Sequence, residues 1–162
     1  MKFKIKKGRH YHSSHWNRIA WMLSKDNTLV QNIVIPKEAW YPDDPNTKDD
    51  SDYNKLFGFG QFNHHKNSAR FVWLPDFFRE GYFDIFAYVY QNGKWKSKYI
   101  TNVRAEETNA YWLEAYDGAG YMFTVNGKEL MFPATNTPYR WILQPFHGGD
   151  LKAPQTYTIE IY

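Results

Sequence analysis

Residues 82–90 alternate strictly between two kinds of side chain. One set is mostly aliphatic and the other mostly aromatic: Phe83, Ile85, Ala87 and Val89 against Tyr82, Asp84, Phe86, Tyr88 and Tyr90. Successive residues of a β-strand point to opposite faces, so this pattern predicts a strand with one core face and one half-wetted aromatic face. Asn92-Gly93 follows at once, and this dipeptide strongly favours a tight hairpin. Residues 82–93 therefore predict antiparallel β-structure in this part of the chain.

Similar strand-length runs recur along the chain, separated by turn signals such as Asn126-Gly127 and Asp117-Gly118. They cover residues 18–23, 29–35, 71–74, 111–116, 121–125, 139–144 and 157–162. With the first residues of the chain and residues 56–59, about ten strands and minimal helix are expected. This pattern predicts an all-β fold, a two-sheet antiparallel sandwich of jelly-roll, concanavalin-like type. The 162 residues fit a single domain over 1–162, with a long acidic loop at 36–54.

Composition narrows the classes of function. The chain has no cysteine, which excludes disulfides, thiolate metal sites and a thiol nucleophile. Its net charge of +3 comes from scattered lysines and arginines, so we expect no nucleic-acid partner. We recognise no signal peptide and no apolar run of membrane-spanning length. We therefore expect no membrane partner and a cytoplasmic or virion-associated location.

Aromatic residues make up 20% of the chain, with seven Trp, thirteen Tyr and twelve Phe. We expect a core of this size to hold only part of them, because buried Tyr and Trp need polar partners. Many should therefore line a surface or groove, where rings stack on sugars or contact another subunit. The candidate rings for such a face are Trp73, Phe86, Tyr88, Trp112 and Trp141, and Glu114 is a polar candidate beside them.

The loop between two predicted strands at residues 61–70 carries a second group of candidates. His64, His65, Asn67 and Arg70 combine imidazole, amide and guanidinium groups, which suit sugar hydroxyls or a carboxylate. The simpler interpretation is a polar loop that hydrogen-bonds its own backbone. Both interpretations stay open at this stage.

Metal and catalytic signals are weaker. His10, His12 and His15 have a spacing that can bind zinc, but no carboxylate or cysteine completes the set. The acidic loop could bridge calcium, although a solvated charge run explains it as well; its acids are Asp43, Asp44, Asp49, Asp50 and Asp52. We therefore predict no cofactor, with calcium or zinc as the alternatives. Asp84 and Glu114 are the candidate pair for glycoside hydrolysis.

Two segments resemble a group of small proteins from Bacteroidota and their phages. The first runs from His64-His65 through Ser68-Ala69-Arg70, after a Leu-Phe-Gly-Phe strand at 56–59. The second is the turn Pro145-Phe146-His147-Gly148-Gly149, which continues to Ala153-Pro154. The resemblance implies a bacterial or phage origin and marks both segments as special, but it supplies no activity.

These features rank three hypotheses of function. The first is non-catalytic binding of a glycan or polysaccharide, with rings stacking on sugar faces and with His65, Asn67 and Arg70 orienting them. The second is an assembly protein, a homo-oligomer or phage-particle component, that buries the aromatic face between subunits. The third is a glycan-cleaving enzyme that uses Asp84, Glu114 or the histidines.

Overall fold

The computed structural model describes residues 1–12, 23–24, 26–43, 52–61, 63–135 and 140–162. In these residues the chain forms twelve strands in two six-stranded sheets. One sheet has the order β1-β12-β3-β8-β9-β10, made of Lys2–Ile5, Tyr157–Ile161, Thr28–Val34, Thr108–Tyr116, Gly120–Val125 and Lys128–Pro133. The other has the order β2-β11-β4-β5-β6-β7, made of Leu23–Ser24, Arg140–Leu143, Asn54–Gly60, Ser68–Pro75, Tyr82–Gln91 and Lys94–Arg104.

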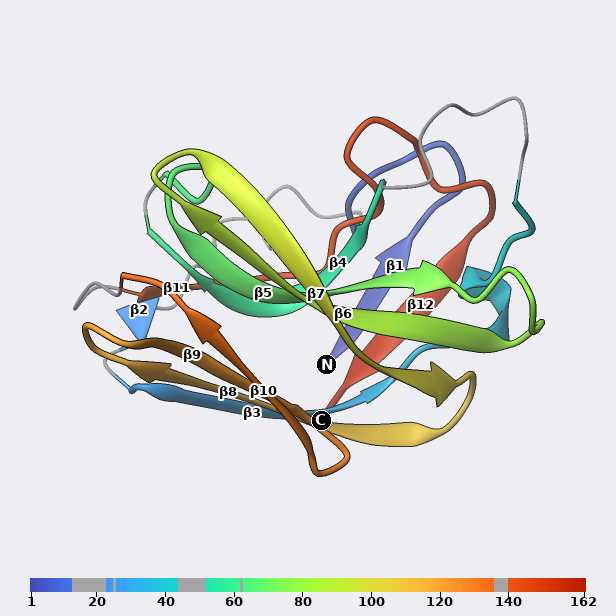
Figure 1. Ribbon diagram of the computed structural model, residues 1–162. Helices are drawn as coiled ribbons and strands as arrows, with labels where there is room; N and C mark the ends of the chain where they lie inside the picture. Colours follow the sequence, from blue (N-terminus) through green and yellow to red (C-terminus); the bar gives the residue numbers. More distant parts are fainter. Residues whose placement is uncertain (13–22, 25, 44–51, 62, 136–139) are drawn as a thin grey trace.

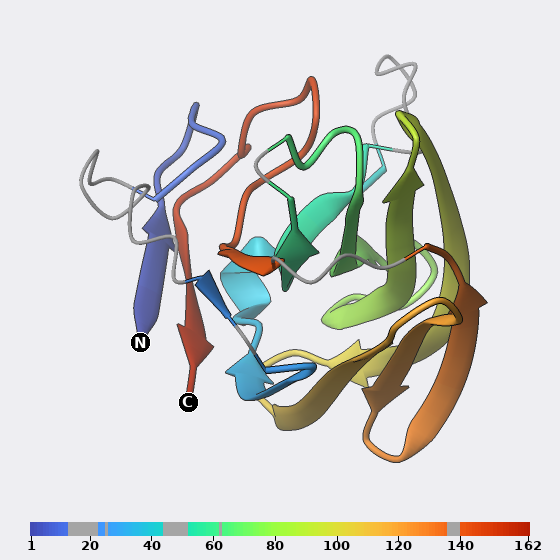
Figure 2. The same cartoon turned by 90° about the vertical axis from the view of Figure 1, so that its left-hand side faces the viewer.

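The two sheets lie face to face and enclose one hydrophobic core (Figure 1). Every strand pair is antiparallel, and strands distant in sequence become neighbours, as where β12 lies between β1 and β3. Figure 2 shows β1 and β12 side by side, with the two chain ends close together. The predicted all-β jelly-roll sandwich is confirmed. Within the described residues, the one helical element is a short 3-10 turn at Lys37–Ala39, and no helix has the length and hydropathy needed to span a membrane.

The strand count is higher than the ten expected from sequence. β7 and β10 add to it because their charged, weakly alternating sequences hide them, although each is the return strand of an Asn-Gly hairpin. Most of the strand expected at residues 18–23 lies outside the described residues. Its last residue, Leu23, belongs to the two-residue strand β2.

β6 has the two faces that its sequence predicts. Phe83, Ile85, Ala87 and Val89 are buried in the core between the sheets. The alternate side chains lie on the outer face, where Phe86 and Tyr90 are half-buried. The hairpin turns are also as expected: Asn92 and Gly93 have φ of 52° and 79°, and Asn126 and Gly127 have 49° and 80°.

Gly58 lies where β4 passes unusually close to β5. A Cβ added there would overlap the carbonyl oxygen of Ala69 and the Cα and Cβ of Arg70. The register of the two strands also shifts between Lys55 and Gly58, which indicates a bulge. This close approach of the two strands fixes the backbone beside Arg70.

Candidate functional site

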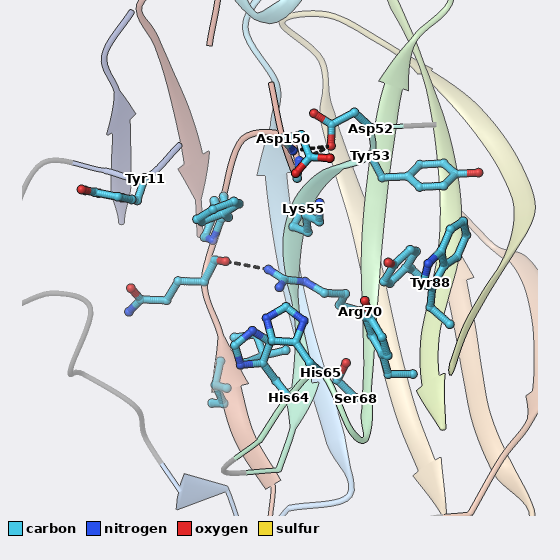
Figure 3. Close-up of a pocket in the computed structure, with 18 of the residues that line it drawn as sticks. Tyr11, Asp52, Tyr53, Lys55, His64, His65, Ser68, Arg70, Tyr88 and Asp150 are labelled. Carbon is cyan, nitrogen blue, oxygen red and sulfur yellow. Dashed lines mark hydrogen bonds between the residues drawn. The ribbon is translucent and has the colours of Figure 1, made fainter. Parts of the chain in front are cut away.

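A pocket of about 730 Å³ is hollowed in the outer face of the β4–β7 sheet. Its floor comes from outward side chains of β5 and β6, among them Ser68, Arg70 and Tyr88. One wall is the His64-His65 loop, and another is the end of β11 with the segment that follows it, residues 142–146. The volume falls in the range of small-molecule sites. Figure 3 shows Arg70 near the middle, between Lys55 on one side and the two histidines on the other.

Arg70 is the most unusual group in the pocket. The residue is only 8% exposed, and its Nη2 donates a hydrogen bond to the carbonyl oxygen of Gln144 at 2.7 Å. Nε has no hydrogen-bond partner, and none of the ion pairs between described residues involves Arg70. Burial lowers the pKa of Arg70 to about 9, so the guanidinium still carries its charge at neutral pH. Burying a cation without a counter-ion raises the free energy of the folded state, so this arrangement requires an explanation.

His64 and His65 lie against each other in the loop wall, with ring centroids 4.2 Å apart. His65 is exposed and meets the ring of Tyr90 edge-on at 5.7 Å. His64 is half-buried, and burial together with the charges of His65 and Arg70 lowers its pKa to about 4. His64 is therefore neutral at neutral pH and can donate or accept a hydrogen bond towards the pocket.

Aromatic rings form the opposite side of the pocket. Tyr88 and Trp95 stack with centroids 5.2 Å apart and planes 19° apart. Tyr53 packs edge-on against both rings and against Phe86, and its hydroxyl lies 2.9 Å from the hydroxyl of Ser97. Burial, and then the hydrogen bond with Tyr90, raises the pKa of Tyr88. Trp95 remains 45% exposed, so a flat ring faces solvent at the edge of the pocket.

The rim near Asp150 is held by one carboxylate. Asp52 accepts hydrogen bonds from the backbone N–H groups of Gly149, Asp150 and Leu151. Lys55 Nζ donates to the carbonyl of Gly148 at 2.7 Å. These bonds fix the turn after β11 against the start of β4, and the Asp52 contact to this turn is drawn in Figure 3.

The buried side of the same turn rests on a histidine. His147 is 2% exposed, and its Nδ1 lies 2.8 Å from the hydroxyl of Tyr157. Burial lowers the pKa of His147 to about 4. The turn that the resemblance singled out is thus bonded to β4 through Lys55 and to β12 through Tyr157.

The structure brings together four of the ten residues predicted to bind ligand: His64, His65, Arg70 and Tyr88 all line the pocket. Phe86 lies beside them under Tyr53. Trp141 is half-buried on β11 and does not line the pocket.

Four predicted positions do not line the pocket. Trp73 is completely buried, because its strand face points into the core and not to solvent. The amide of Asn67 is used within the protein, bonded to Gln61 and to the backbone N–H of Asn92. Trp112 and Glu114 point outward from β8, which belongs to the other sheet, so the core separates them from the pocket.

The metal candidates are engaged by protein groups. Nδ1 of His10 lies 3.0 Å from the carbonyl oxygen of His147, and Nε2 of His12 lies 2.8 Å from Oε1 of Gln144. Among the residues that the structure describes, no three acidic or histidine side chains gather in a metal-binding group. His15 and most of the acidic loop, from Asp44 to Asp50, lie outside the described residues.

Sequence reasoning missed several pocket residues, among them Tyr53, Lys55, Trp95 and Gln144. Trp95 could have been found, because a two-residue turn at Asn92-Gly93 sets it directly opposite Tyr90. Tyr53 and Gln144 reach the pocket from segments far apart in the chain, and no local pattern marks them.

Comparison with known proteins shows a likeness of fold. No family model matches the chain, and no curated protein matches it in sequence. A solved structure that it resembles is an alginate lyase from Pseudomonas aeruginosa, with a TM-score of 0.54 and 8% identity. The match covers 85% of this chain but 62% of that enzyme, so the chain spans less than two thirds of its length. At this identity the likeness supports the jelly-roll fold alone.

Proposed function

We propose that this protein binds a glycan in the pocket on the outer face of the β4–β7 sheet. The observation that carries the proposal is the pairing of an exposed ring, Trp95 stacked on the buried Tyr88, with the polar side chains of His64, His65 and Arg70 in one pocket. Rings offer area for the apolar faces of sugars, while directed donors select hydroxyl and acidic groups. One protein of similar fold is an alginate lyase, so polysaccharides are the first ligands to test.

Non-catalytic binding is favoured over hydrolysis by a carboxylate pair. Such hydrolysis needs two carboxyl groups across one bond. Asp84 and Glu114 cannot meet this requirement, because β6 and β8 belong to different sheets and both side chains lie on outer faces. Cleavage that uses the pocket histidines stays a prediction, and analysis of products after incubation with polysaccharides tests it.

The proposal is tested by screening the protein on a glycan array and titrating the best ligand by calorimetry. Trp95→Ala should weaken binding about tenfold, because it removes one stacking face. Trp112→Ala is the matched control, since Trp112 is equally exposed, at 47% against 45%, but lies on the other sheet. Absence of binding to every glycan, or equal effects of the two changes, would contradict the proposal.

Assembly through the aromatic face remains the competing prediction. It requires that a second copy cover the platform. Analytical ultracentrifugation over a wide concentration range separates the two, because a monomer at all concentrations argues against assembly. If the chain does associate, Trp95→Ala should weaken the association and glycan should compete with it.

A further inference from the structure

We infer that Arg70 forms an anion subsite of the pocket, so that the glycan bound there carries an acidic group, a carboxylate or a sulfate ester. This inference rests on the proposed function and deepens it from a glycan to an acidic glycan.

The first support is the state of the guanidinium. Arg70 is more than nine-tenths buried and has no counter-ion among the described residues, and its Nε has no partner. The bond to Gln144 uses one N–H of Nη2, and no other hydrogen bond joins the planar guanidinium fork to the described residues. Such a fork matches the paired oxygens of a carboxylate or sulfate.

The second support is the position of that fork. Arg70 lines the same pocket as the Tyr88–Trp95 platform, and Figure 3 shows it between Lys55 and the histidine pair. An acidic group placed there would meet a charged donor while the sugar ring reaches the aromatic side.

The third support is that the acidic side chains lining the pocket do not pair with Arg70. Asp52, the one buried carboxylate of the pocket lining, is taken up by three backbone N–H groups of the turn at 149–151. Asp150 is exposed at the rim. Neither forms an ion pair with Arg70, so the cation keeps its capacity for an external anion.

The test compares acidic oligosaccharides with matched neutral ones. The probes are oligouronates, the same oligomers with each carboxylate reduced to an alcohol, and sulfated oligosaccharides, all titrated by calorimetry. We expect at least one acidic series to bind the protein and its neutral counterpart to bind at least tenfold more weakly. The two acidic series separate a carboxylate from a sulfate.

Two variants assign the effect to this residue. Arg70→Gln should lower affinity for the acidic probe about 10- to 100-fold and abolish the preference for it over the neutral one. Arg104→Gln is the control, because it removes the same charge from an exposed side chain outside the pocket. Arg70→Lys keeps the charge without the fork and should bind between the two.

A measurement on the unaltered protein guards against misfolded variants. Bound anion should raise the pKa of His64, followed by NMR of its ring protons, because it cancels the nearby charge of Arg70. The neutral probe should not raise it.

The outcomes separate the two proposals. Tight binding of neutral and acidic probes alike, or no effect of Arg70→Gln on acidic binding, overturns the anion subsite and leaves glycan binding in place. Absence of binding to any glycan overturns both.

Discussion

The carbonyl oxygen of Gln144 accepts a hydrogen bond from Nη2 of Arg70 at 2.7 Å, across 74 residues of sequence. The bond joins β5, on the floor of the pocket, to the wall that follows β11. It directs a buried guanidinium without neutralising it.

Arg70 should contribute little to stability. Arg70→Gln loses one hydrogen bond but removes a buried charge that has no counter-ion, and these effects oppose each other. We expect the free energy of unfolding in urea to change by no more than about 1 kcal/mol. A loss of about 3 kcal/mol or more would instead make Arg70 a structural support.

Gly58 should be intolerant of any side chain. Gly58→Ala places a methyl group into the backbone of Ala69 and Arg70, which cannot move without separating β4 from β5. Urea unfolding should show a loss of about 3 kcal/mol.

Gly118→Ala controls for glycine replacement as such. Gly118 has φ of +76° and open space around it, so the cost should stay near 1–2 kcal/mol, from backbone strain alone. Equal losses for the two variants would refute the close-approach explanation.

Asp52 should stabilise the turn that forms one rim of the pocket. Asp52→Asn replaces an ionised acceptor of three backbone N–H groups by a neutral one, and we expect a loss of about 1–3 kcal/mol in urea. Asp150→Asn, on the same rim but exposed, should change stability by less than about 0.5 kcal/mol. A result in which both changes cost the same would remove the anchoring role from Asp52.

His147 should make stability depend on pH. The folded chain binds the proton of His147 only near pH 4, whereas the unfolded chain binds it near its ordinary pKa of 6.5. Protonation therefore favours unfolding, so this contribution is complete above about pH 6.5 and is lost as the pH falls towards 4.

The shift of the His147 pKa corresponds to roughly 3 kcal/mol. Unfolding measured at pH 7.5 and 4.5 should show a loss in the unaltered protein that exceeds the loss in His147→Gln by roughly 2 kcal/mol. Parallel pH profiles would show that His147 is not the group responsible.

Local sequence patterns were sufficient to predict the fold class. The alternation in β6 set its two faces, and the Asn-Gly pairs set two hairpins. These features depend on periods of two residues and on φ values of single residues, which the chain carries locally.

The choice of sheet was decided only by tertiary structure. Trp73 and Trp112 were both predicted from the sequence to belong to the aromatic face. In the structure Trp73 is buried in the core, and Trp112 lies on the outer face of the other sheet. The two-residue period of a strand divides its side chains between two faces. It does not tell which face packs against the opposite sheet, or which strands belong to the same sheet. The pocket depends on that assignment, because Tyr53, Arg70 and Gln144 meet only after distant segments pack together. The sequence by itself therefore determined a β-sandwich with an aromatic strand face. Only the tertiary structure placed this face beside a buried arginine that forms no ion pair with the described residues.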